Sequence, residues 1–310
     1  MQNYNLGIHV FEELDLDWEE EIICINLLSI LSWKRFHGPI QIYCNTKYKQ
    51  TLQKWGLDSL YDKINTDVID NKPLDIDYEQ NWAFVKFLVL KEVKNLTPFT
   101  LVDNDLWIIK RLDMNSQNDV TMYHFEGFSN DYINNIYEDF DYLVPQKVIN
   151  LNLDKNISPT NTALLSINNG SFIDEWVNLC EEIASYNKNI ELRTRNKSIK
   201  MCFLEQRLLP MLLTKRGLTY STYLEHTYLS HKAEPQDGSE WYPLLENSTE
   251  SQIDKFSSIK HVWGMKKLFR HFEVRKLIIT NCLTNLMEYD INDKPYTQLI
   301  IKMINTYQNS

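Results

Sequence analysis

The chain has 310 residues, of which 43% are hydrophobic and 24% charged, as in ordinary globular proteins and unlike disordered or fibrous ones. Its formal net charge of −10 repels nucleic acid and anionic membranes, so neither is expected as a partner. A negatively charged substrate would therefore need a local device, such as a metal ion or a few lysines.

Cysteine spacing and hydropathy indicate the cellular compartment of the protein. The five cysteines are far apart and form no C-x-x-C pair, which argues against a zinc site or a disulfide framework and predicts buried free thiols in a reducing compartment. The N-terminus lacks the basic start and apolar core of a signal peptide. No apolar run approaches the roughly 18 residues that span a bilayer. We expect a cytoplasmic protein without a transmembrane segment, either soluble or peripheral at the inner face of the membrane.

Strand and helix patterns alternate in the first half of the chain. The stretch WEEEIICINLLSILSWKR has apolar residues at helical spacing, and shorter apolar runs bounded by breakers predict strands. The expected strands are 7–11, 40–45, 64–69 and the run FTLV before Asp103, and the expected helices are 18–35, 47–56 and 81–96. This alternation is typical of an α/β fold with a mainly parallel sheet between helices, in which ligands bind at the carboxyl ends of strands.

The second half predicts a strand, several helices and one irregular region. The strand is 162–167, the loop-rich region is 226–260, and the helices are 171–186, 201–217 (bent or broken at Pro210), 266–289 and 294–307. We expect one main domain over residues 1–265 and a helical C-terminal extension, 266–310, packed on it.

The stretch PFTLVDNDLWII interrupts an apolar run with two aspartates, Asp103 and Asp105. If the run stays extended, residues i and i+2 point to the same face, so the two carboxylates would lie side by side. Their charges repel unless a cation lies between them, and carboxylate oxygens suit Mg²⁺ or Mn²⁺. The alternative is a solvated turn that happens to hold two acids.

A second pattern, HVWGMKK, gives His261, Gly264 and Lys267 the spacing H-x-x-G-x-x-K. A neutral imidazole can complete a metal shell, a glycine allows close backbone approach to a phosphate, and a lysine can neutralise a diphosphate. The alternative is a surface histidine before a basic helix start.

Together the two motifs resemble those of GT-A glycosyltransferases, especially the retaining family-8 type. The resemblance implies a GT-A, Rossmann-like, mixed and mainly parallel sheet. It also implies that Asp103, Asp105 and His261 bind Mn²⁺ (or Mg²⁺), while Gly264 and Lys267 contact the diphosphate of a nucleotide sugar. The segment from Trp33 to Leu112 further resembles an uncharacterised group of bacterial GT-A-like proteins.

The activity implied is transfer of a hexose, with retention, from a UDP-linked or other nucleotide-diphosphate sugar to a glycan or glycoconjugate, as in polysaccharide biosynthesis. Lys86, on the helix before the D-x-D strand, would face the nucleotide sugar, although it could instead snorkel from an amphipathic helix. His9 or Phe11 would flank the base, or serve only the first strand.

Two carboxylates are candidates on the acceptor side. Glu205 begins the pair Glu205-Gln206, which resembles the acidic residue and glutamine found near many GT-A acceptor sites. Glu126 shares a face with His124 if residues 121–128 are extended. Either glutamate would be the first candidate for a general base if the reaction inverts. Trp241 and Tyr242 could form a sugar-stacking platform or be buried anchors.

Other readings stay open. The chain could bind a nucleotide sugar or glycan without turning it over, as an inactive member of a polysaccharide-assembly system. It could be another metal-dependent enzyme on a similar sheet, such as a nucleotidyltransferase, although no glycine-rich phosphate loop follows the first strand. It could also be a structural partner whose acids are merely solvated.

Overall fold

The computed structural model describes residues 5–12, 18–113, 117–126, 141–192, 199–228 (only the backbone over 225–228), 258–262 and 269–307. The chain divides into two compact units. The first comprises Met1–Asp70, Leu101–Leu112 and Lys232–Ser310, and the second comprises Asn71–Thr100 and Asp113–His231.

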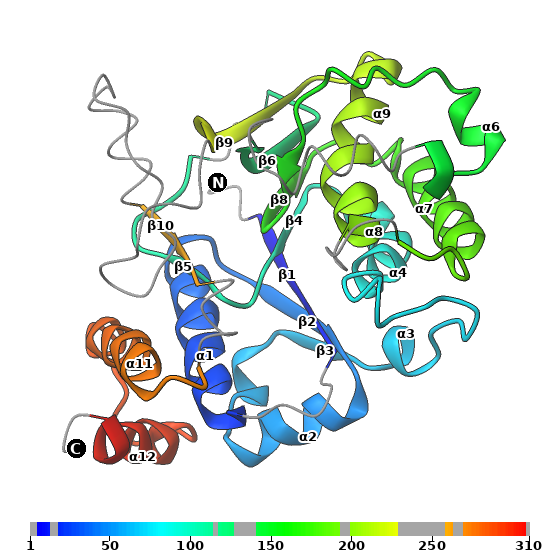
Figure 1. Ribbon diagram of the computed structural model, residues 1–310. Helices are drawn as coiled ribbons and strands as arrows, with labels where there is room; N and C mark the ends of the chain where they lie inside the picture. Colours follow the sequence, from blue (N-terminus) through cyan, green and yellow to red (C-terminus); the bar gives the residue numbers. More distant parts are fainter. Residues whose placement is uncertain are drawn as a thin grey trace. The chain divides into compact units, whose positions relative to one another are not determined.

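The first unit is a parallel sheet with helices beside it (Figure 1). Its strands pair in the order β3-β2-β1-β4, and β1 with β2 and β2 with β3 are parallel. Elements in the N-terminal part are β1 (Leu6–Phe11), α1 (Glu19–Phe36), β2 (Ile40–Cys44), α2 (Thr46–Lys54), β3 (Lys63–Asn65) and α3 (Asp67–Asp70).

Two further parts of the chain complete this unit. A small antiparallel sheet joins β5 (Leu106–Ile108) to β10 (Ile259–His261). The C-terminal helices α11 (Phe272–Leu286) and α12 (Thr297–Tyr307) lie side by side and pack against α1 (Figure 1). The expected C-terminal helices are therefore confirmed, whereas a domain boundary between residues 265 and 266 stays a prediction.

The second unit has a mixed sheet with the order β4-β8-β6-β7, and β9 pairs with β6. Strand β6 is antiparallel to β7 and β8 but parallel to β9. The residues of β4 are divided between the two units. The elements of the second unit, with the shared strand β4, are α4 (Val85–Val93), β4 (Phe99–Val102), β6 (Val120–Glu126), α6 (Gln146–Ile149), β7 (Thr160–Asn161), β8 (Leu164–Ile167), α7 (Ile173–Asn187), α8 (Ile199–Cys202), a π-helical turn (Phe203–Arg207), α9 (Leu208–Arg216) and β9 (Tyr220–Tyr228).

The predicted α/β class, with a mixed, mainly parallel sheet and flanking helices, is confirmed. The expected strand over 64–69 is wrong in its second half, because the Asn65 side chain accepts a hydrogen bond from Val68 N and starts helix α3. The helix expected over 81–96 begins only at Val85, after a series of turns.

The helical stretch is not broken at Pro210, and its irregularity lies in the turn that precedes this proline. A proline ring clashes with the carbonyl four residues earlier, and the chain widens there into the π-helical turn Phe203–Arg207. Pro210 itself lies inside α9. Of the region expected to be loop-rich, 226–228 belongs to β9 and most of the remainder is outside the described residues.

The cysteines and most of helix α1 are buried. All five cysteines are free and buried, as expected. Helix α1 is buried along almost its whole length, including Asn26 and Ser32, and it forms the centre of the first unit. Among the described residues, no helix has the length and apolarity needed to cross a membrane.

Candidate functional site

Asp103 and Asp105 lie where the chain leaves the buried strand β4. Every residue of β4 is buried, and the chain then turns, with Leu106 N donating to Asp103 O at 3.0 Å, before β5 begins. The aspartates are therefore at the carboxyl end of the strand, as predicted. The expected extended geometry is wrong, because a turn and not an alternating strand brings the two carboxylates together.

His261 reaches the same turn from a distant part of the sequence. It is the last residue of β10, which pairs antiparallel with β5 so that His261 lies opposite Leu106. The next residue continues the contact, since Val262 N donates to Asp105 O at 3.1 Å. The pairing of two short strands thus fixes the histidine beside the aspartates.

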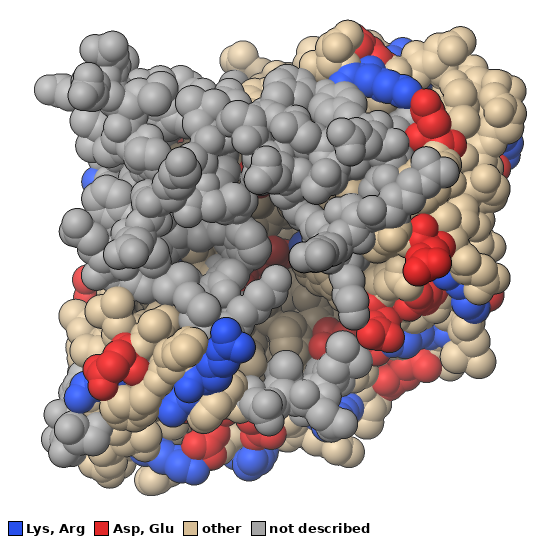
Figure 2. Space-filling model, viewed as in Figure 1, with Lys and Arg blue, Asp and Glu red and all other residues tan. Residues whose placement is uncertain are grey.

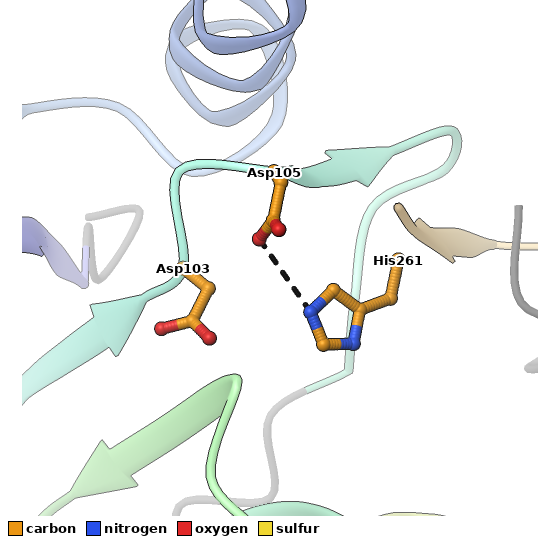
Figure 3. A group of neighbouring side chains, drawn as sticks. All are labelled: Asp103, Asp105 and His261. Carbon is orange, nitrogen blue, oxygen red and sulfur yellow. Dashed lines mark ion pairs between the residues drawn. The ribbon is translucent and has the colours of Figure 1, made fainter. Parts of the chain in front are cut away.

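The three side chains point toward one another (Figure 3). One ligand atom from each of Asp103, Asp105 and His261 lies within 4.8 Å of the others, and His261 Nε2 is 3.5 Å from Asp105 Oδ1. Asp105 and His261 are 4% and 3% exposed, so little water screens their charges. Two carboxylates and an imidazole are a donor set that fits a divalent cation such as Mn²⁺ or Mg²⁺.

His9 is buried on β1 of the same unit. Its Nδ1 is 2.9 Å from the Tyr61 hydroxyl and its Nε2 is 3.3 Å from Ser29 Oγ. Burial lowers the pKa of His9 to about 3, although the charge of Asp105 acts in the opposite direction. The neutral ring therefore ties β1 to α1, and contact between His9 and a nucleotide stays a prediction.

Phe11 ends β1 and is half-buried. Its ring contacts that of Tyr48, with the centroids 4.3 Å apart. Its predicted position beside a nucleobase is not tested by these contacts and stays a prediction.

In the second unit, Lys86 and Glu205 form a buried ion pair, with Lys86 Nζ 2.7 Å from Glu205 Oε1. The Thr162 hydroxyl donates to the same oxygen at 2.7 Å. The sequence suggested roles for Lys86 and Glu205 separately but not their contact. Thr162 was expected only as the first residue of the strand over 162–167.

Glu205 owes its position to the π-helical turn. The carbonyl of Leu204, the preceding residue, accepts a hydrogen bond from Trp176 Nε1 at 3.1 Å and lies 3.8 Å from Cys180 Sγ. Arg207, also in the turn, is buried and donates to the carbonyls of Lys155 and Ile157. The Trp176 side chain on α7 and two backbone carbonyls of a loop thus hold the widened turn.

Glu126 ends β6 and is buried, with 7% of its surface exposed. Asn161 Nδ2 on β7 donates to Glu126 Oε1 at 3.2 Å, and Asn161 Oδ1 accepts from Ala163 N. Glu126 and Glu205 thus belong to separate hydrogen-bonded pairs. Their catalytic roles stay predictions.

Several residues that the sequence singled out lie outside the described residues. These are Gly264 and Lys267 of the second motif, and Trp241 and Tyr242. The asparagine Asn26, which contacts the turn that carries Asp103 and Asp105, was missed because it lies inside an apolar helical pattern. The feature of the sequence that could have identified Asn26 is its single amide side chain within the apolar run ICINLL.

Charges are mixed on the described part of the surface. On the face drawn in Figure 2, the described Lys and Arg residues lie among Asp and Glu residues. Ion pairs between partly exposed side chains include Lys34 with Asp62 and Lys94 with Asp174.

Solved glycosyltransferase structures are among those similar to this chain, and no curated protein matches it. Galactosyltransferase LgtC, solved with donor and acceptor sugar analogs, has 10% identity and a TM-score of 0.39, covering 70% of this chain and 72% of its own. PaToxG glycosyltransferase has 12% identity and a TM-score of 0.41, with 69% of each chain covered. The bifunctional glycosyltransferase WbbM has 11% identity and a TM-score of 0.48, covering 98% of this chain and 52% of its own.

A family model matches the sequence over most of its length. The match covers residues 19–271, which include the Asp103–Asp105 turn, Lys86, Glu205 and His261. The chain therefore belongs to DUF6734, a family of unknown function.

Proposed function

We propose that the chain is a metal-dependent glycosyltransferase. It moves a hexose from a nucleotide-diphosphate sugar, UDP-linked, to a glycan or glycoconjugate acceptor, with retention of configuration, in cytoplasmic polysaccharide biosynthesis. The observation that carries the proposal is the grouping of Asp103, Asp105 and His261 within 4.8 Å. These are the residues that the D-x-D and H-x-x-G-x-x-K motifs suggested as metal ligands.

The grouping supports the proposal for an electrostatic reason. Two carboxylates that share a site repel each other unless a positive charge lies between them, and burial of Asp105 strengthens that repulsion. A divalent cation held by Asp103, Asp105 and His261 relieves it. When bound, the cation supplies charge stabilisation to the departing diphosphate.

Other residues of the chain bind the donor and the acceptor. Lys267 and Gly264 bind the diphosphate, and Phe11 or His9 borders the nucleobase. In the second unit, Lys86 and Glu205 offer a cation and a carboxylate that can hydrogen-bond sugar hydroxyls, and Glu126 is the second candidate carboxylate. The overall charge of −10 makes such local cations necessary for a dianionic donor.

Thermal unfolding with a panel of nucleotide-diphosphate sugars, with and without Mn²⁺, tests the proposal. The expected result is stabilisation by one donor only when Mn²⁺ is present, lost in Asp105→Ala and kept in Asp113→Ala. Asp113 is a matched control, because it is an exposed aspartate a short distance further along the same segment. The absence of any metal-dependent shift would contradict the proposal.

Release of the nucleoside diphosphate separates catalysis from binding. With a glycan acceptor present, the proposed enzyme releases the diphosphate in the presence of Mn²⁺. If the donor binds with the metal but no diphosphate is released with any acceptor, the chain is a nucleotide-sugar-binding protein and not a transferase.

A further inference from the structure

We propose that Asn26 is a positioning residue that holds the Asp103–Asn104–Asp105 turn in its metal-binding conformation. This inference rests on the proposed metal site and adds to it a residue that is not itself a metal ligand. It starts from the amide of Asn26, which lies in the middle of α1 and is 1% exposed.

The contacts of the amide define its orientation. One end faces the backbone carbonyls of Ile22 and Asn104, and the other faces the Tyr48 hydroxyl. Carbonyl oxygens only accept hydrogen bonds, so the end that faces them is the NH₂ group. Asn26 Nδ2 then donates to Asn104 O at 2.8 Å and to Ile22 O at 3.3 Å, while Asn26 Oδ1 accepts from Tyr48.

Hydrogen bonds fix three successive carbonyls of the turn. The carbonyl of Asp103 accepts from Leu106 N, and that of Asp105 accepts from Val262 N. The carbonyl between them, that of Asn104, accepts from Asn26. The outer two bonds use backbone donors, whereas the central one uses a side chain, so a substitution at Asn26 can remove that bond and leave the backbone donors in place.

The central bond bears directly on the two ligands. The peptide groups on either side of Asn104 join it to Asp103 and Asp105, so a rotation there would change the directions of both carboxylates. Asn104 is 6% exposed, and water is therefore a poor substitute for the lost donor. Residues that orient metal ligands in this indirect way typically change metal affinity by about 10- to 100-fold when mutated.

Tyr48 extends the same support. Its hydroxyl donates to Asn26 Oδ1 and keeps the amide from rotating, and its ring contacts Phe11. Tyr48 lies on α2 and is 1% exposed. The turn that carries the candidate ligands is therefore held by α1 through Asn26, and by α2 through Tyr48.

Titration of the full-length, metal-free protein with Mn²⁺, followed by electron paramagnetic resonance, tests the inference. We expect Asn26→Leu to weaken Mn²⁺ binding by about 10- to 100-fold. The control is Asn285→Leu on α11. The side-chain amide of Asn285 also donates to a backbone carbonyl, that of Asn281 in its own helix, at 2.8 Å. The control variant should bind Mn²⁺ as the wild type does.

The outcomes separate the inference from the proposed function. If the wild type binds Mn²⁺ and Asp105→Ala does not, while Asn26→Leu binds as the wild type does, the positioning role is overturned and the metal site stands. If the wild type does not bind Mn²⁺, both are overturned. Should Asn26→Leu fail to fold, Tyr48→Phe decides, because unchanged Mn²⁺ affinity in that variant contradicts the inference and a severalfold weakening supports it.

Discussion

Lys86 and Glu205 are 119 residues apart in the sequence and form a largely buried ion pair at 2.7 Å. Their side chains are 14% and 7% exposed, and Thr162 adds a hydrogen bond to the same carboxylate oxygen. Lys86 was predicted to face the donor sugar and Glu205 the acceptor, on separate grounds, and the two side chains are in direct contact. Each is positioned by the other.

Removing one member of this pair leaves the other charge buried. We expect Lys86→Met to lower the free energy of unfolding by about 3–5 kcal/mol, measured by urea denaturation. Lys91→Met on the same helix is the control, since Lys91 and Glu181 form an exposed pair at 3.3 Å and its loss should cost less than about 1 kcal/mol. Equal losses in the two variants would show that burial does not strengthen the Lys86–Glu205 pair.

His37 should make stability depend on pH. Burial lowers the pKa of His37 to about 4, with the nearby charge of Arg111 acting in the same direction, from the value of 6.5 for a free side chain. The unfolded chain therefore binds a proton between these values that the folded chain does not, so stability falls as the pH drops below 6.5. Between pH 7 and pH 5 this loss is about 2 kcal/mol.

Urea denaturation of the metal-free protein at both pH values measures this effect. In His37→Gln, which does not titrate, the difference in stability between pH 7 and pH 5 should be smaller by about 2 kcal/mol. An unchanged difference would mean that His37 titrates normally in the folded chain.

Gly7 should not tolerate a side chain. A Cβ added there would lie 2.4 Å from Trp33 Nε1, and the indole of Trp33 is fully buried and donates to Pro39 O. We expect Gly7→Ala to reduce the free energy of unfolding by about 1–3 kcal/mol because the core must shift. Chemical denaturation of the purified variant measures this loss.

Gly217 provides the comparison for that variant. It ends α9 with φ +65°, and a Cβ added there would meet no atom within 4 Å. Gly217→Ala should therefore cost only the backbone strain, about 1 kcal/mol. A larger loss for Gly217→Ala than for Gly7→Ala would contradict the packing argument at Gly7.

Local patterns in the sequence predicted most of the described helices and about half of the described strands, since helical spacing and short apolar runs report on burial directly. The position of Asp103 and Asp105 at a strand end followed from the same patterns. Helix α3 was missed because a single side chain, Asn65, starts it. That contact leaves no periodic signal.

The candidate site depended more on long-range packing. The place of His261 beside Asp105 results from the pairing of β10 with β5, which no local pattern predicts, and only the motif resemblance suggested it. The contact of Lys86 with Glu205 and that of Asn26 with Asn104 were not predicted for the same reason. Residue types identified the candidates, and tertiary structure decided their partners.

Asp103, Asp105 and His261 are proposed to bind one divalent cation. Diffraction from crystals grown with Mn²⁺, measured near the manganese absorption edge, would locate that ion. We expect one anomalous peak at bonding distance, about 2 Å, from an oxygen of each aspartate and a nitrogen of His261. A peak bound elsewhere, or none at saturating Mn²⁺, would contradict that proposal.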